Sequence, residues 1–250
     1  MNDLYETEPI ILALDSSSKV TSLAVARGRS LLGAINDMPD QKRSEMLWTE
    51  VGTLLAKHNT TLGDIDLFAV CIGPGGFTGL RVGMSAVMGF AASTDKPIVG
   101  VSSLEATAFT ARPAEMACAL VNAYKGEVYS QLFSFDAEGV PIAKSDAMVS
   151  SLAKALERAD DKELVFVGDG TEAGADEIRS FAASRSYITW TVKTESGLAE
   201  AIAQLAYWKY LRGETQTAAG IKAFYVRPSE AEIKLSLGLL GSKIKRSLKP

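Results

Sequence analysis

Short apolar runs separated by polar turns alternate along this chain with longer segments whose apolar residues recur at helical spacing. The short runs are typical of strands, and the longer segments are typical of amphipathic helices. In the first half, this pattern predicts strands at 10–15, 21–26 and 30–36, a helix at 43–58, a strand at 67–72, a helix at 78–92, a strand at 98–101 and a helix beginning after Ser102. The first three strands would form an antiparallel meander, and the run at 67–72 would be buried on both faces.

The second half repeats this order in outline. It predicts strands at 118–123, 127–135 and 143–148, a helix at 150–158, a strand at 164–167, and helices at 172–184 and 197–211. Each half opens with a strand, a polar turn and a second strand, although no residue-level repeat is visible. The sequence therefore predicts a duplicated α/β protein with an N-terminal lobe at 1–112, a C-terminal lobe at 113–228 and a basic tail at 229–250.

A glycine-rich stretch, Gly73 to Gly83, lies between the buried strand and the second helix. Gly75 and Gly76 can take positive φ here, and Thr78 is a candidate N-cap of the helix. One interpretation is a phosphate cradle at a helix N-terminus. The other, which we favour, is a tight turn before a closely packed helix, because neither standard nucleotide-binding glycine pattern is present.

The helix that follows carries small residues on one face. Gly79, Gly83 and Ala86 share this face at helical spacing, which predicts a shallow groove for the close approach of another helix, from this chain or from a second one. If the groove is exposed, Gly83→Leu should block association and leave the fold largely intact.

Composition excludes several classes of protein. The net charge of −4 provides no general attraction to nucleic acid, although Arg227 and the tail together carry a net charge of +4, which could contact RNA or simply be solvated. Cys71 and Cys118 lie in apolar strands, as buried thiols of a reducing compartment do, and the N-terminus does not resemble a signal peptide, so we expect a cytoplasmic protein without a membrane partner. The single histidine, His58, argues against a metalloprotease or another histidine-rich metal site.

The turn between the first two strands, Asp15-Ser16-Ser17, resembles the first phosphate loop of the actin, sugar-kinase and Hsp70 fold, although it is also ordinary turn chemistry. Five stretches together resemble the TsaB family, also called YeaZ, over residues 10 to about 230. They are 11–17, 73–83, 100–105, 126–129 and 225–227. The stretch at 73–83 is the most specific. Three positions depart from the family pattern: Gly76 replaces a serine, Arg43 replaces a histidine, and Asn122-Ala123-Tyr124 replaces Asp-Ala-Arg.

The resemblance implies an actin-like ATPase fold and a non-catalytic scaffold subunit of the machinery that forms threonylcarbamoyladenosine in tRNA. It implies a heterodimer with the catalytic paralogue TsaD, contact with the ATPase TsaE, a homodimer through the same face, and tRNA reached indirectly. On this basis the partner interface comprises Arg43, Glu45, Leu47, Trp48, Phe77, Gly79, Arg81, Val82, Gly83, Ala86 and Val87, and a vestigial phosphate loop comprises Asp15, Ser16, Ser17, Gly75 and Gly76.

We expect no catalytic or metal-ligating residue and no tightly bound cofactor, with ATP or ADP and Mg²⁺ confined to a partner interface. The alternative is an independent actin-like ATPase or small-molecule kinase in which Asp15 acts through Mg²⁺. Asn122 weakens this alternative, because it stands where a phosphate-handling relative would have a carboxylate. The sequence also lacks a clear adenosine-binding glycine pair.

Overall fold

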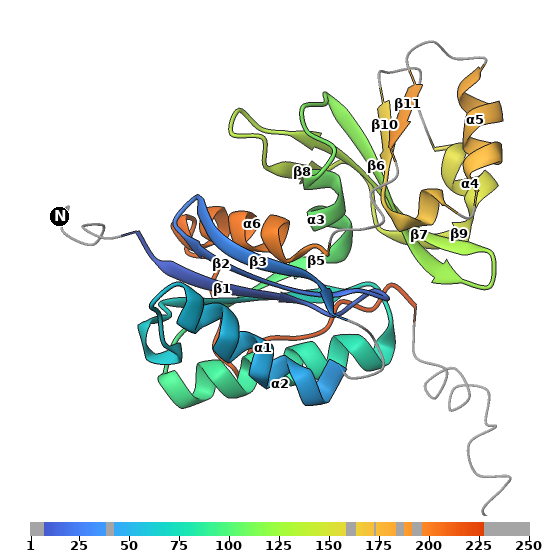
Figure 1. The fold of residues 1–250 in the computed structure, drawn as a ribbon. Coiled ribbons are helices and arrows are strands. Elements are labelled where there is room, and N and C mark those ends of the chain that lie inside the picture. The colour runs from blue at the N-terminus through green and yellow to red at the C-terminus, as the bar shows by residue number, and fades with distance from the viewer. Residues whose placement is uncertain are drawn as a thin grey trace, which may run out of the picture.

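The computed structural model describes residues 8–38, 43–158, 164–172, 174–183, 188–191 and 197–227. The first sheet has the order β3-β2-β1-β4-β5. Its strands are β1 (Ile10–Asp15), β2 (Thr21–Arg27), β3 (Ser30–Met38), β4 (Leu67–Gly73) and β5 (Ile98–Ser102). The meander β1–β2–β3 is antiparallel, as the sequence predicts, whereas β4 and β5 run parallel to β1. The result is a mixed sheet (Figure 1).

Helices cover both faces of this sheet. On one face lie α1 (Arg43–Lys57) and α2 (Phe77–Thr94), with the short 3₁₀ helix η2 (Leu62–Asp64) between them in the chain. On the other face lies α6 (Ala199–Leu211). The sequence of β1 fits this arrangement, since Leu12 and Leu14 pack in the core beneath α1 and α2 while Ile11 and Ala13 pack in the core beneath α6. A run without polar alternation is what a strand buried on both faces requires.

The second sheet has the order β11-β10-β6-β7-β8, and β9 also pairs with β7. Its strands are β6 (Met116–Tyr124), β7 (Glu127–Phe135), β8 (Pro141–Ala143), β9 (Met148–Ser151), β10 (Leu164–Val167) and β11 (Ile188–Thr191). The 3₁₀ helix η3 (Asp169–Thr171) follows β10. Two helices, α4 (Leu152–Leu156) and α5 (Ala175–Ala183), lie beside one another on this lobe (Figure 1). Between the two sheets, α3 (Ser103–Phe109) packs against the second sheet through Leu104 and Ala108.

Several predictions for the second half were wrong in detail. A single strand was predicted at 143–148, but the chain forms two short strands, β8 and β9, on either side of a turn. The predicted helix at 150–158 is shorter, and β11 was not predicted. Outside the described residues lie the tail at 229–250 and the side chains of Arg43 and Glu45.

The largest difference concerns α6, which the sequence analysis placed in the C-terminal lobe at 113–228. It packs on β1, β2, β4 and β5 of the first sheet through Ile202, Leu205 and their small neighbours. The N-terminal lobe is therefore discontinuous in sequence. Within the described residues, no helix is both long enough and apolar enough to cross a membrane.

Candidate functional site

The turn after β1 is closed by hydrogen bonds to its own chain. The carboxylate of Asp15 is fully buried, and its Oδ1 accepts a hydrogen bond from the amide of Ser17 at 2.9 Å. Its Oδ2 accepts one from the amide of Leu198, just before α6, at 3.5 Å. The hydroxyl of Ser22 accepts a bond from the amide of Ala199 at 3.1 Å. Asp15 and Ser22 thus satisfy amides at the start of α6 and attach the beginning of that helix to the first lobe.

The glycine-rich loop is packed against this turn. The amide of Gly76 donates to the carbonyl of Ser17 at 2.7 Å, and the hydroxyl of Ser16 donates to the carbonyl of Gly79 at 2.8 Å. A Cβ at Gly75 would lie 2.5 Å from the carbonyl oxygen of Ser17, so no larger residue fits there without rearrangement. The structure thus brings both halves of the predicted phosphate loop together. Because the amide of Gly76 is already hydrogen-bonded within the chain, it is unavailable to a phosphate.

The backbone of the loop differs from our expectation. Positive φ occurs at Gly73 (103°), which precedes a cis peptide bond to Pro74, and not at Gly75 or Gly76. Gly76, with φ of −61°, is the N-cap of α2, and Thr78 lies inside the helix. The next helix begins after Ser102, as predicted, and the hydroxyl of Ser102 caps it by accepting a hydrogen bond from the amide of Leu104 at 3.2 Å.

The small-residue face of α2 is not an exposed groove, so that prediction was wrong. Gly79, Gly83 and Ala86 are buried within the first lobe. A Cβ at Gly83 would lie 2.2 Å from the Oγ of Ser16 and 2.8 Å from a methyl carbon of Leu14, so α2 approaches the end of β1 closely at this point. Leu47 and Val87, also predicted at the interface, belong to the same core. Their burial leaves these five residues unavailable for direct contact with a partner.

The opposite faces of α1 and α2 expose large side chains. Trp48 is 58% exposed and contacts Phe90 edge to face, with ring centroids 4.7 Å apart. Phe77 is 40% exposed, and the guanidinium carbon of Arg81 lies 3.9 Å from its ring centroid. Val82, next to Arg81 in the sequence, is half-buried, whereas the partner of Trp48, Phe90, lies toward the other end of α2. We call Trp48, Phe77, Arg81 and Val82 the α1–α2 face. Large exposed aromatic side chains with an arginine are typical of binding surfaces.

A small cavity of about 100 Å³ lies between the lobes. Its walls come from the turn after β1, from α3 and from the second lobe, and include Ser17, Lys19, Ser103, Thr107, Asn122, Asp169 and Glu172. Pockets that bind ligands of drug size usually enclose roughly 300–1,000 Å³. The cavity is therefore smaller than the pockets that usually hold ligands of that size.

Asp169 is a carboxylate at this cavity that the sequence analysis missed. Its Oδ1 accepts a hydrogen bond from the amide of Asn122 at 2.9 Å, so the second lobe has an acid beside the position where the family pattern expects one. Burial raises the pKa of Asp169, and the negative charges of Glu172 and Asp15 raise it further, against the lowering effect of the Asn122 amide. One signal could have found it: the sequence Gly168-Asp169-Gly170 ends a buried strand, as Asp15 does in the first lobe.

The two glycines that flank Asp169, Gly168 and Gly170, have packing roles. A Cβ at Gly168 would lie 2.2 Å from the carbonyl oxygen of Leu120, and one at Gly170 would lie 2.9 Å from the same atom. This close approach by itself requires glycine at both positions.

The cysteines are buried, as predicted. Burial raises the pKa of Cys118 to about 12 and raises that of Cys71 well above its ordinary value, so neither thiol is an activated nucleophile. His58 follows α1, and its imidazole packs against Gly33 of β3. Among the described residues, no group of three or more His, Cys, Asp or Glu side chains could hold a metal ion.

Comparisons with known proteins place this architecture in a family. Residues 38–235 match the family model described as TsaD, tRNA N6-adenosine threonylcarbamoyltransferase. A Haemophilus influenzae protein named tRNA threonylcarbamoyladenosine biosynthesis protein TsaB is 33% identical over 123 residues, which are 48% of this chain and 51% of that protein. This chain thus spans about half the length of that relative. The Bacillus subtilis protein of the same name is 27% identical over 227 residues, which are 90% of this chain and 96% of its own length.

The solved structures include a Pseudomonas aeruginosa protein described as similar to the peptidase YeaZ. It has a TM-score of 0.74 at 24% identity and covers 88% of this chain and 100% of its own. This similarity confirms the predicted α/β fold of two lobes, each with a mixed sheet. The family-model match covers well over half of the chain. The chain therefore belongs to the family that this TsaD model describes, and it is similar to the relatives named TsaB and YeaZ.

Proposed function

We propose that this chain is a non-catalytic scaffold subunit in the biosynthesis of threonylcarbamoyladenosine in tRNA. In this role it binds a catalytic TsaD paralogue through the α1–α2 face and contacts the ATPase TsaE within the complex. It contacts tRNA only indirectly, through the complex, and it acts in the cytoplasm. When the paralogue is absent, a second copy of the chain occupies the same face. ATP or ADP with Mg²⁺ is confined to the interface with a partner.

The observation that carries this proposal is the contrast between the two candidate sites. The turn at Asp15–Ser17 and the loop at Gly75–Gly76 are hydrogen-bonded to one another, and the cavity behind them is about 100 Å³. The α1–α2 face instead exposes Trp48, Phe77 and Arg81, the residue types that most often dominate binding energy at interfaces. The chain thus offers surface for association and little accessible chemistry.

Binding to the purified TsaD paralogue of the same organism tests the proposal. Calorimetry should detect a complex with this chain, and Trp48→Ala should weaken it by about tenfold or more, as expected for an interface hot spot. Ile142→Ala is the matched control, because Ile142 is 44% exposed on β8 of the second lobe, away from this face. Equal binding by the Trp48 variant and the unchanged chain would exclude the α1–α2 face.

The second candidate function is an independent ATPase or small-molecule kinase. One observation favours it: Asp15 ends β1 and Asp169 follows β10, and Asp169 lines the small cavity whose walls also include the turn after β1. Calorimetry with Mg-ATP on the isolated chain separates the two candidates. Tight binding with turnover supports the kinase or ATPase, and its absence in the isolated chain supports the scaffold.

A further inference from the structure

After α6, the chain returns along the edge of the first sheet as a segment we call the strap, residues 221–227. Before the strap, Ile98 of β5 and Gln216 exchange two backbone hydrogen bonds of 2.8 Å each. Within it, Ile221 is buried in the core beneath α1 and α2, and the amide of Phe224 donates to the carbonyl of Ile72 on β4 at 2.8 Å. The strap is therefore attached to the sheet by backbone hydrogen bonds and by a buried side chain.

The strap adds an aromatic side chain to the α1–α2 face. Tyr225 is 43% exposed, and its ring centroid lies 5.8 Å from that of Phe77, within the range of favourable aromatic pairs. Arg81 lies over the same Phe77 ring, so Arg81, Phe77 and Tyr225 form a continuous row of side chains. The exposed surface at the start of α2 is thus built from two segments far apart in the sequence.

The end of the strap is attached to the other lobe. A guanidinium nitrogen of Arg227 lies 2.6 Å from the carboxylate of Glu127, the first residue of β7 in the second sheet. Only Val226 separates Arg227 from Tyr225, so this ion pair restricts where the Tyr225 ring can lie. Release of the pair would leave Tyr225 with more conformations to lose when a partner binds, and such ordering weakens binding.

We propose that Tyr225 of the strap is part of the surface that binds the TsaD-type paralogue, and that the Arg227–Glu127 pair is a positioning contact that makes this surface depend on the placement of the second lobe. This inference rests on the proposed function. The paralogue is the occupant because the row Arg81, Phe77 and Tyr225 continues directly from the face proposed above. Both members of the ion pair are about one third exposed, so its contribution is modest.

The test measures the affinity of the full chain for the paralogue by calorimetry. Arg227→Ala and Glu127→Ala should each weaken binding by about two- to fivefold, as expected for a partly exposed pair. The two changes together should weaken binding no more than either alone, because each removes the same contact. The charge exchange Arg227→Glu with Glu127→Arg should recover most of the lost affinity. Tyr225→Ala, which removes the aromatic contact itself, should weaken binding by about tenfold or more.

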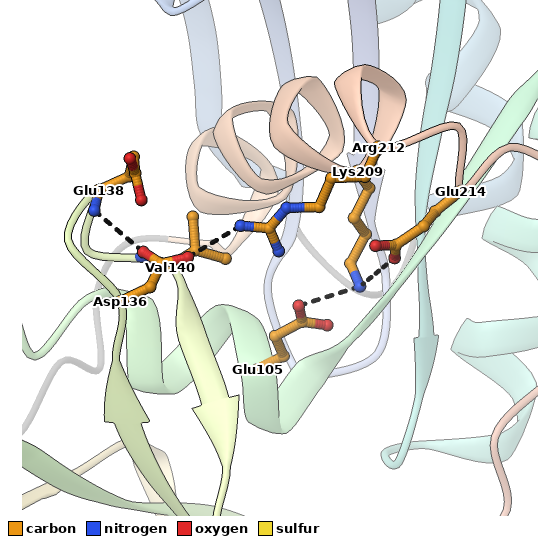
Figure 2. A network of polar contacts seen from close by, with 7 residues as sticks. All are labelled: Glu105, Asp136, Glu138, Val140, Lys209, Arg212 and Glu214. Carbon is orange, nitrogen blue, oxygen red and sulfur yellow. Dashed lines mark hydrogen bonds and ion pairs between the residues drawn. The ribbon is translucent and has the colours of Figure 1, made fainter.

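A matched control is available at a second ion pair between the lobes. After α6, Arg212 pairs with Asp136 of the β7–β8 turn at 2.8 Å, beside the contacts of Lys209 with Glu105 at 3.1 Å and with Glu214 at 3.5 Å (Figure 2). Arg212→Ala removes one inter-lobe pair of the same chemistry without touching the strap. It should leave the affinity for the paralogue unchanged.

The outcomes separate the two proposals. If the unchanged chain binds the paralogue and Arg227→Ala binds equally well, the positioning role is overturned while the scaffold proposal survives. If Arg212→Ala weakens binding as much as Arg227→Ala does, loss of any ion pair between the lobes weakens binding, and the specific role of the strap is overturned. Failure of the unchanged chain to bind overturns both. Thermal denaturation of each variant confirms that it is folded before its affinity is compared.

Discussion

Substitution of Gly83 tests whether α2 is packed against its own sheet. In Gly83→Ala, the new Cβ would lie 2.2 Å from the Oγ of Ser16 and 2.8 Å from a methyl carbon of Leu14. Overpacking of this kind costs roughly 1–3 kcal/mol of stability. Displacing Ser16 also removes its hydrogen bond to the carbonyl of Gly79, which contributes about 1 kcal/mol. Replacing glycine with alanine in a helix stabilises it by about 1 kcal/mol, so the net decrease in the free energy of unfolding should be roughly 1–3 kcal/mol.

The same helix provides the control. Gly89 is exposed, and a Cβ added there would have no neighbour within 4 Å, so Gly89→Ala should gain up to about 1 kcal/mol from helix propensity alone. Equilibrium urea denaturation gives both free energies of unfolding, and thermal denaturation should shift by about 2–4 °C for each kcal/mol. The reasoning fails if Gly83→Ala is as stable as the unchanged chain, because the close approach of α2 to β1 would then be absent.

Three further predictions concern ionisable groups and the exposed face. Because the pKa of Asp169 is raised in the folded state, its contribution to stability is greatest below the ordinary pKa of an aspartate and is lost as the pH rises through the raised value. Asp169→Asn should therefore be more stable than the unchanged chain near pH 7, with an advantage that shrinks toward pH 4 in thermal denaturation; a constant difference would contradict this. Cys71 and Cys118 should react with a thiol reagent at pH 8 only after unfolding, because burial raises the pKa of both thiols. Rapid labelling of the native chain would contradict their burial. Trp48→Ala should reduce the free energy of unfolding of the isolated chain by only about 0.5–1.5 kcal/mol, which is the value of its aromatic contact with Phe90. Urea denaturation measures this difference. A larger loss would mean that Trp48 supports the core instead of the surface.

The apolar pattern predicted the strands of the first sheet and the three long helices α1, α2 and α6, because their periodicity reflects burial in these elements. It could not predict which sheet α6 covers. The chain passes through the whole second lobe before α6, which then packs on the first sheet through its apolar side chains and whose first amides donate hydrogen bonds to Asp15 and Ser22. Such pairings between positions more than 170 residues apart leave no periodic signal in the sequence.

The small-residue face of α2 was misread for a related reason. Close approach of a helix requires glycine and alanine whether the neighbour is a strand of the same chain or a helix of another one. The spacing of Gly79, Gly83 and Ala86 therefore indicates contact but not the partner in that contact. The large side chains that these two helices expose, Trp48 and Phe77, give no such periodic signal.

The position of Asp15 bears on where catalysis can take place. Its two carboxylate oxygens accept the amides of Ser17 and Leu198 in a fully buried environment. A divalent cation at this carboxylate would compete with both amides, and a buried amide without an acceptor costs about 1–3 kcal/mol. Since one of these amides belongs to the start of α6, which covers the first sheet, metal chemistry at Asp15 would disturb the packing of that helix. The residue that most resembles a catalytic acid in the sequence is thus committed to holding the fold together, and this favours a role in which the chemistry belongs to the partner.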